Sequence, residues 1–315
     1  MRLLAFSDIH HNLVAVRKLR AAETNSFDAI VVAGDIGNES AAGLFKILAT
    51  FKCPVVYVYG NWDNDLGYDT RFGDDCHLVQ SNVIAIGDIS FTGFSGCPTN
   101  WGRNPIFLKL RRQIEAENKA IADALKRGIR PSVETRRTKA YQKFALKLRS
   151  AGSEALKLNR QSIGNAVKRA KVDPRNCVVI THERLSRLSE DVPGALLHLF
   201  GHLHRFSESS HQGTKYVNVA ALDRPVSARP RAKLKWRRED IRNINAGNYV
   251  KIEITRSRRI RVGCVNLAHD YPDWIPLQDR RYNGIAWVPE EADWTEASDR
   301  PLTLRNTRIV KSDVT

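Results

Sequence analysis

Seven residues with metal-binding side chains fall into five separate clusters, and each cluster directly follows a short apolar run. They are Asp8, His10, Asp35, Asn61, His182, His202 and His204. Carboxylate, amide and imidazole groups suit first-row divalent ions and differ from the thiolate sets of structural zinc. Buried strands end in loops at one edge of a sheet, and the sites of α/β proteins gather at that edge. We therefore expect the seven side chains to meet in a metal-centred active site.

The spacing within the clusters indicates two metal ions. Asp8 and His10 are separated by one residue, as are His202 and His204, and alternate side chains at a strand end point the same way. Asp35 offers two carboxylate oxygens and could bridge two ions. Two ions roughly 3.5–4 Å apart can hold a bridging hydroxide and clamp a phosphoryl group for in-line attack. The residues therefore predict hydrolysis of a phosphoester.

The ordered pattern DxH, GD, GNxD, H and GHxH resembles the calcineurin-like binuclear metallophosphoesterases. The opening Ser7-Asp8-Ile9-His10, with Asn12 after it, is also close to the usual opening of that family. The resemblance covers about residues 1–100 and 175–220, and it implies a layered α+β fold, a two-layered β-sandwich flanked by helices. It also implies two ligand sets, namely Asp8, His10, Asp35 and His204 for one ion and Asp35, Asn61, His182 and His202 for the other.

The sequence departs from the family beside Asn61. Family members often carry a His after this Asn to protonate the leaving group, whereas Trp62 stands here, and indole cannot exchange a proton near neutral pH. Candidates for the general acid are His11, Asp63 and a metal-bound water, and a good leaving group needs no acid. Asp63 could instead hold the Asn61 loop in place. Trp62 could pack the loop or stack on a base.

The elements that must position these residues alternate along the first hundred residues. Apolar strands are expected from residue 2, at 28–33 and at 54–59, helices at 12–22 and 40–51, and an antiparallel hairpin at 83–94. Strand signals return at 176–181, 195–200, 214–219, 248–255 and 260–266. His198 lies inside one of these apolar runs and is expected to be a core residue and not a ligand.

The segment 103–172 interrupts this rhythm, because it lacks strand signals and is rich in Ala, Leu, Lys, Arg and Gln. We expect a helical hairpin there, with a turn at 128–131. The predicted organisation is a discontinuous metallophosphoesterase core (1–102 and 173–266), a basic helical insertion (103–172) and a tail (267–315). The aromatic residues of the tail are expected to dock it on the core.

The net charge of +16 is concentrated in two segments. Residues 103–171 contain 19 Lys and Arg against 5 Asp and Glu, and residues 229–261 contain 12 against 3, so the rest of the chain is net acidic. Clustered Lys and Arg gain affinity for polyphosphates by releasing counterions, which predicts a nucleic-acid or nucleotide substrate. Arg111 and Arg112 are candidate substrate contacts, together with Trp62. The alternative is a helix pair that binds a partner protein or the ribosome without any link to catalysis.

The composition favours a cytoplasmic protein with no membrane contact. The five cysteines are scattered and lack CxxC spacing, which suits a reducing compartment. No apolar run approaches the roughly 20 residues of a membrane span.

We therefore predict a binuclear, metal-dependent phosphodiesterase that acts on nucleic acid or nucleotide, with His11 or Asp63 as catalytic groups. Mn²⁺ is the preferred ion because the oxygen and nitrogen ligands leave room for octahedral geometry, and Fe, Zn and Ni are alternatives. The rival functions are a phosphomonoesterase acting on phosphoprotein or a small metabolite, and a nucleic-acid-binding protein without turnover. The sequence does not indicate an oligomeric state.

Overall fold

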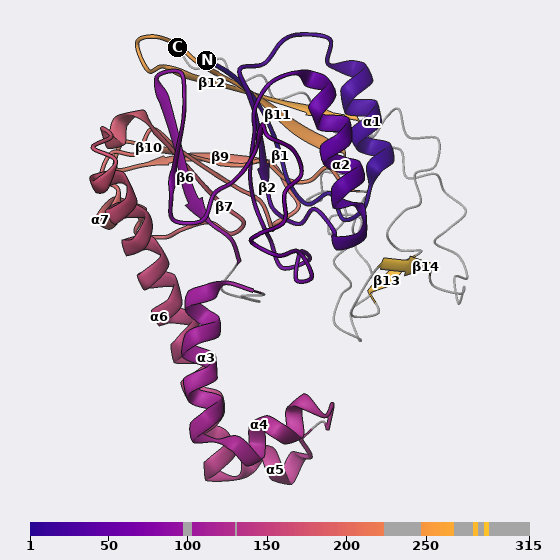
Figure 1. The fold of residues 1–315 in the computed structure, drawn as a ribbon, viewed down its shortest axis with the longest axis vertical. Coiled ribbons are helices and arrows are strands. Elements are labelled where there is room, and N and C mark those ends of the chain that lie inside the picture. Colours follow the sequence, from indigo (N-terminus) through magenta and orange to yellow (C-terminus); the bar gives the residue numbers. More distant parts are fainter. Residues whose placement is uncertain (97–102, 130, 224–246, 268–279, 283–286, 290–315) are drawn as a thin grey trace.

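The computed structural model describes residues 1–96, 103–129, 131–223, 247–267, 280–282 and 287–289, and its core is built from two six-stranded sheets (Figure 1). The first sheet has the order β12-β11-β1-β2-β3-β4 and the second β5-β6-β7-β8-β10-β9. The strands of the first sheet are β1 (Arg2–Phe6), β2 (Ala29–Ala33), β3 (Val55–Val58), β4 (Cys76–Leu78), β11 (Asn248–Ile254) and β12 (Ile260–Asn266). Those of the second are β5 (Val83–Ile86), β6 (Ile89–Phe94), β7 (Cys177–Thr181), β8 (Leu197–Phe200), β9 (Ser207–His211) and β10 (Thr214–Asn218). A separate antiparallel pair consists of β13 (Arg280–Tyr282) and β14 (Trp287–Pro289).

The two sheets pack face to face around a common apolar core. Alternate residues of β1 divide between the two faces: Leu3 belongs to the core between the sheets, and Leu4 belongs to a second core on the outer face. From the opposing sheet, Phe91 and Ile180 enter the same inter-sheet core. Strands covered on both faces need apolar residues at every position, which explains why the sequence runs are continuous and not alternating.

Helices cover both outer faces, which confirms the predicted sandwich flanked by helices. The first sheet is covered by α1 (Leu13–Ala22) and α2 (Ala41–Leu48), while α6 (Lys139–Arg169) and α7 (Leu188–Asp191) lie against the second (Figure 1). Asn12 caps α1, because its side chain accepts a hydrogen bond from the Ala15 backbone N–H. Short 3-10 helices span Asn38–Ser40, Ala49–Phe51 and Pro174–Asn176.

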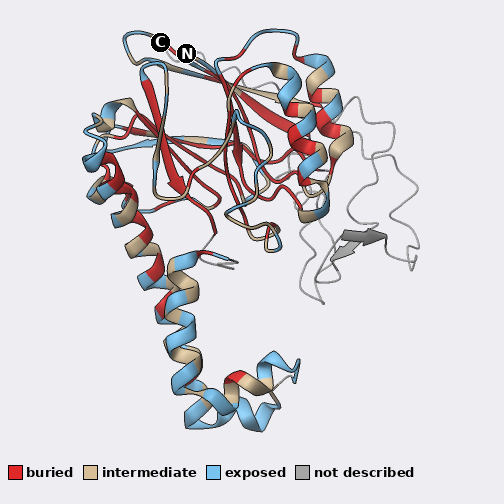
Figure 2. Cartoon of the chain, viewed as in Figure 1, coloured by how far each residue is buried: buried red, intermediate tan, exposed pale blue. Residues whose placement is uncertain are grey.

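The described residues between β6 and β7 include four α-helices, of which only part packs on the sheet. These are α3 (Pro105–Glu117), α4 (Lys119–Lys126), α5 (Val133–Arg137) and α6. The C-terminal half of α6 buries Ala155, Ile163 and Val167 against the second sheet. Its N-terminal half pairs with α3 and extends away from the sheets, with α4 and α5 at the far end (Figures 1 and 2). We refer to residues 103–149 as the helical arm.

Two short strands, β4 and β9, had not been predicted. Both lie at sheet edges, and β9 consists of Ser207-Glu208-Ser209-Ser210-His211, which has no apolar alternation. Short, polar edge strands discourage pairing with other chains, so they carry little strand signal. None of the described helices is both long and apolar enough to span a membrane. The predicted domain boundaries stay predictions, and the tail lies largely outside the described residues.

Candidate metal centre

The seven candidate ligands follow the C-terminal ends of parallel strands in both sheets. Strands β1, β2 and β3 run parallel in the first sheet, and β6, β7 and β8 run parallel in the second. Their ends carry, in chain order, Asp8 and His10, then Asp35, Asn61, His182, and finally His202 and His204. Since the two sheets pack together, these loops converge on one edge of the sandwich.

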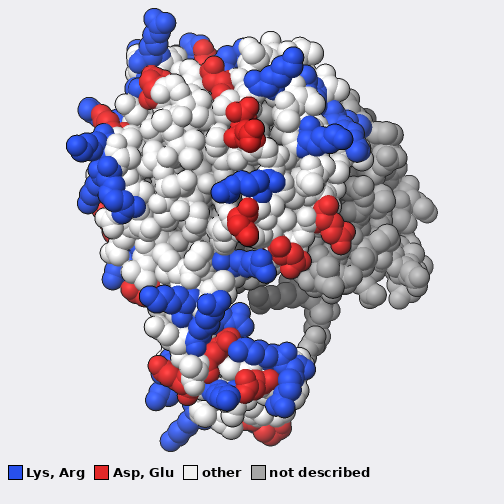
Figure 3. Space-filling view, viewed as in Figure 1, with Lys and Arg blue, Asp and Glu red and all other residues white. Residues whose placement is uncertain are grey.

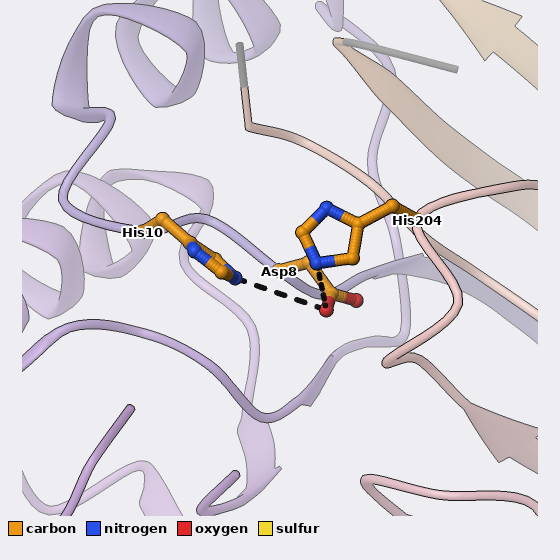
Figure 4. Close-up of side chains that lie close together, drawn as sticks. All are labelled: Asp8, His10 and His204. Carbon is orange, nitrogen blue, oxygen red and sulfur yellow. Dashed lines mark ion pairs between the residues drawn. The ribbon is translucent and has the colours of Figure 1, made fainter. Parts of the chain in front are cut away.

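The first group of converging side chains is Asp8, His10 and His204 (Figure 4). Their ligand atoms all lie within 4.8 Å of one another. Asp8 Oδ1 is 3.2 Å from His204 Nε2 and 3.9 Å from His10 Nε2. Ser7 Oγ and the His202 backbone N–H donate to Asp8 Oδ2, at 2.5 and 3.0 Å, which leaves Oδ1 directed at the imidazoles.

The second group is Asp35, His182 and His202, and it touches the first through Asp35. Asp35 Oδ2 lies 3.2 Å from His182 Nε2 and 3.3 Å from His10 Nε2, so one oxygen faces both groups. His202 Nδ1 lies 3.3 Å from His182 Nε2. The other Asp35 oxygen, Oδ1, accepts the backbone N–H of Trp62 at 2.9 Å. This bond joins the half-buried Asn61–Trp62 turn to the two groups.

Three neighbouring acceptors orient the histidines. The Ala33 carbonyl lies 2.9 Å from His182 Nδ1; a carbonyl can only accept, so Nδ1 carries a proton and Nε2 is the ring nitrogen that faces the centre. Asp223 Oδ2 is 3.6 Å from His10 Nδ1, and Glu183 Oε1 is 3.2 Å from His202 Nε2. Each contact leaves the opposite ring nitrogen facing the centre.

Sequence reasoning missed both Asp223 and Glu183. Glu183 directly follows a candidate ligand, and this adjacency was a usable signal. Asp223 lies five residues beyond the end of β10, and no motif marks it. Only the folded chain brings its buried carboxylate beside His10.

The backbone at the site is unusual, because five of the seven candidate ligands adopt positive φ. The values are Asp8 51°, His10 47°, Asp35 54°, His202 68° and His204 46°. Side-chain-bearing residues rarely occupy this region, and such residues cluster at functional sites where the surrounding structure imposes the strain. Close packing adds to this constraint, since a Cβ added at Gly60 would lie 2.1 Å from Asp35 Oδ1.

The electrostatics favour a bound cation. Burial raises the pKa of Asp8, but His204 and His10 outweigh it and bring the pKa down to about 2. Burial lowers the pKa of His182, yet the Asp35 carboxylate raises it to about 10. Burial also lowers the pKa of His204, to about 4. Both ring nitrogens of His10 are buried and form no hydrogen bond within the described residues. Ionised carboxylates and unsatisfied imidazoles directed at shared points fit divalent ions.

Asp63 and His11, the two candidate catalytic groups, have different surroundings. Asp63 is buried, and its two oxygens accept the backbone N–H groups of Gly37 and Gly60, both at 2.8 Å. It therefore links the loops after β2 and β3, and burial together with Asp35 raises its pKa to about 6. His11 is half-buried, and this burial lowers its pKa. Only His11 reaches the surface, so its geometry suits contact with a substrate better.

The structure separates the three candidate substrate contacts. The Trp62 ring lies against His10, with centroids 4.5 Å apart, and 6.5 Å from His11. Arg111 and Arg112 lie on α3 in the helical arm and not at the strand ends, and Arg111 pairs with Glu115 at 2.6 Å. His198 is fully buried, and its Nε2 contacts Thr181 Oγ1 at 2.9 Å.

The second basic segment, 229–261, is only partly described, because residues 224–246 lie outside the described ranges. The described part forms the hairpin of β11 and β12. Glu253 pairs with Arg2, at the start of β1, whereas the candidate ligands follow its end. The basic residues Arg256–Arg261 therefore lie at the opposite edge of the sheet from the metal centre.

Comparisons with known proteins agree with the motif order. Residues 1–124 match the model of the calcineurin-like phosphoesterase superfamily domain, which confirms the predicted resemblance. No match was found among curated proteins.

Among solved structures, the chain is similar to a conserved uncharacterized protein of Streptococcus pneumoniae TIGR4 described as a predicted phosphoesterase (14% identity, 86% of this chain and 93% of that one, TM-score 0.36). It is also similar to a phosphopantetheinyl hydrolase of Mycobacterium tuberculosis (16% identity, 70% of this chain and 88% of that one, TM-score 0.38). A third similar structure is that of an archaeal phosphodiesterase (11% identity, 84% of this chain and 100% of that one, TM-score 0.36). These TM-scores lie below 0.5, so the resemblance to the family rests on the sequence match of residues 1–124.

Proposed function

Residues 1–124 match the calcineurin-like phosphoesterase superfamily domain, which identifies the chain as a hydrolase of phosphoric esters, and we propose that its site holds two divalent metal ions and cleaves phosphodiesters. The observation that carries this proposal is the position of Asp35 Oδ2, which lies between His10 and His182 at 3.3 and 3.2 Å. A shared carboxylate oxygen is the feature that two neighbouring ions require.

The ligand sets follow from the two groups. Asp8, His10 and His204 would hold one ion, His182, His202 and the Asn61 amide would hold the other, and Asp35 would belong to both. When bound, the ions would supply positive charge to the phosphoryl oxygens and lower the pKa of a water. The oxygen and nitrogen donors suit Mn²⁺, with Fe, Zn and Ni as alternatives.

The protein's own groups determine which phosphoester fits. In the described part of the chain, no Lys or Arg pairs with the buried carboxylates Asp8 and Asp35. A phosphomonoester carries a second negative charge that Arg or Lys commonly binds, whereas a diester does not need this cation. A direct comparison of a diester with a monoester therefore distinguishes the two substrate classes.

Two half-buried aromatic rings border the site, and their chemistry suits contacts with a substrate. Trp62, packed on His10, can stack on a nucleobase and cannot act as an acid. Burial lowers the pKa of half-buried His11, whose ring N–H can donate a hydrogen bond to a phosphoryl oxygen. These two residues support a nucleotide or nucleic-acid substrate.

The test compares bis-p-nitrophenyl phosphate with p-nitrophenyl phosphate at equal Mn²⁺ concentration. We expect faster cleavage of the diester and its loss in Asp35→Ala. Preference for the monoester would favour the phosphomonoesterase function. If neither compound were cleaved while nucleic acid bound tightly, the protein would be a binding protein.

A further inference from the structure

We propose that the helical arm binds the phosphate backbone of a nucleic-acid substrate and thereby sets a minimum substrate length. This inference rests on the proposed phosphodiesterase function and specifies its substrate class. A mononucleotide would reach the metal centre alone, whereas a longer strand would reach the arm as well.

The base of the arm is built into the loops that carry candidate ligands. Asn104 Nδ2 donates to the Ser95 carbonyl at 2.8 Å, and Ser95 Oγ accepts the Tyr59 backbone N–H, next to the Gly60-Asn61 turn. Asn104 and Asn159 also exchange hydrogen bonds between their amides at 3.1 Å. These contacts are buried, so the arm starts at a fixed position beside the loop after β3.

A second anchor joins α6 to the loop that carries His182. Arg160 is nearly buried and donates to Asp191 at 2.9 Å, Glu190 at 2.8 Å and the Ser186 carbonyl at 3.1 Å. Charge-assisted bonds of this kind are shorter and stronger than neutral ones. The arm is therefore held against both loops and projects from the same edge of the sandwich as the metal centre (Figure 1).

The arm retains free positive charge along its length. Glu115 pairs with Arg111 and Lys126, and Glu117 pairs with Lys147. Other cations of the arm are exposed and have no acidic partner among the described residues: Lys109, Arg112, Lys119, Arg127, Arg136, Arg137, Lys139 and Arg149. Lys and Arg are visible around the arm and its base in Figure 3. Unpaired cations release counterions on binding a polyanion.

The helix geometry gives the length. From Asn159 at the base to Lys139 near the far end, α6 rises about 30 Å at ~1.5 Å per residue. Phosphates along one strand of a duplex are spaced about 3.4 Å apart. A substrate that contacts both the metal centre and the end of the arm must therefore extend about nine nucleotides along one strand.

The test measures affinity of the full-length protein for labelled DNA and RNA of 4, 8, 12, 16 and 24 nucleotides, single- and double-stranded, by fluorescence anisotropy in EDTA. Affinity for the duplexes is expected to rise up to about nine nucleotides per strand and then level off. Turnover of the same oligonucleotides with Mn²⁺ should show the same length dependence in kcat/KM.

Two matched double variants isolate the arm. Arg136→Gln/Arg137→Gln should weaken binding of long substrates roughly tenfold and reduce the slope of log affinity against log salt by about 2, without changing bis-p-nitrophenyl phosphate turnover. Arg256→Gln/Arg259→Gln removes the same charge at the opposite edge of the sheet. It should change neither the affinity for long substrates nor the slope of log affinity against log salt.

Length-independent affinity, or an arm variant that binds like wild type, would overturn the inference. The exposed Ile129, Val133 and Leu146 would then assign the arm to a protein partner. Failure of the proposed function has a different signature, since bis-p-nitrophenyl phosphate would then remain uncleaved whatever the arm binds.

Discussion

Replacing Asp223 by Asn should weaken metal binding by 10- to 100-fold without unfolding the protein. The Asp223 carboxylate lies 3.6 Å from His10 Nδ1, and both side chains are at most 5% exposed. Two full charges at this distance would interact by about 5 kcal/mol at an effective dielectric constant of 20. When His10 is a neutral imidazole bound to an ion, its interaction energy with Asp223 is only a fraction of this value. Outer contacts of metal-binding histidines commonly contribute 10- to 100-fold in affinity, or about 1.4–2.7 kcal/mol.

The pH dependence gives this prediction a second readout. Burial lowers the pKa of His10, but Asp223 and Asp35 outweigh it and hold the pKa well above its usual value. In the metal-free protein, a proton therefore competes with the ion for His10. Asp223→Asn lowers the pKa and weakens this competition, so the loss of affinity should be larger at pH 8.5 than at pH 6.

Isothermal titration with Mn²⁺ at the two pH values measures both effects. Asp88→Asn is the matched control, because Asp88 is 68% exposed and pairs with Arg258 at 3.1 Å, away from the site. An Asp223→Asn affinity within threefold of wild type at pH 8.5 would refute the orienting role of Asp223.

Three further variants test the site and its supports. Gly60→Ala would place a Cβ 2.1 Å from Asp35 Oδ1 and should reduce Mn²⁺ affinity at least tenfold in the same titration, whereas Gly263→Ala, whose nearest neighbour is at 3.9 Å, should not. Arg160→Ala leaves Asp191 without its partner and should lower the free energy of unfolding by about 3–5 kcal/mol in urea. Arg175→Ala breaks a pair whose Arg is 81% exposed and should leave the free energy of unfolding nearly unchanged. Burial lowers the pKa of His198 to about 3. Below the usual His pKa of about 6.5 the unfolded chain therefore binds a proton that the folded protein does not, and the free energy of unfolding falls. His198→Leu should remove up to about 5 kcal/mol of that acid-induced loss, and equal slopes of stability against pH for both proteins in EDTA would contradict it.

The order of motifs predicted the fold because each motif marks the end of a buried strand. Leu3 and Leu4 face different cores, so the sequence must be apolar at both positions, and this continuous run is easy to recognise. By contrast, β9 is a polar edge strand whose pairing with β10 depends on backbone hydrogen bonds. Backbone bonding leaves no mark in the sequence, and β9 was therefore not predicted.

The candidate ligands were predictable as residue types, but their geometry was not. That Asp35 faces both groups depends on its φ of 54° and on the space left by Gly60. The orienting role of Asp223 depends on the path of the chain after β10, which brings a residue distant in sequence to His10. The position of the second basic segment likewise could not be predicted, because it depends on the register of β11 on β1. This register places Arg256–Arg261 at the edge of the sheet opposite the metal centre.

Each ligand group draws side chains from both sheets, so the site forms only where the two sheets meet. Asp8 and Asp35 come from the first sheet, whereas His182 and His204 come from the second. Two buried carboxylates on one edge would repel each other unless positive charge lay between them. In the metal-free protein a protonated His182 supplies that charge, since Asp35 raises its pKa to about 10. A divalent ion would supply the same charge and release the proton. The buried carboxylates thus favour positive charge where the two sheets meet, and the same preference suits this edge to a metal ion.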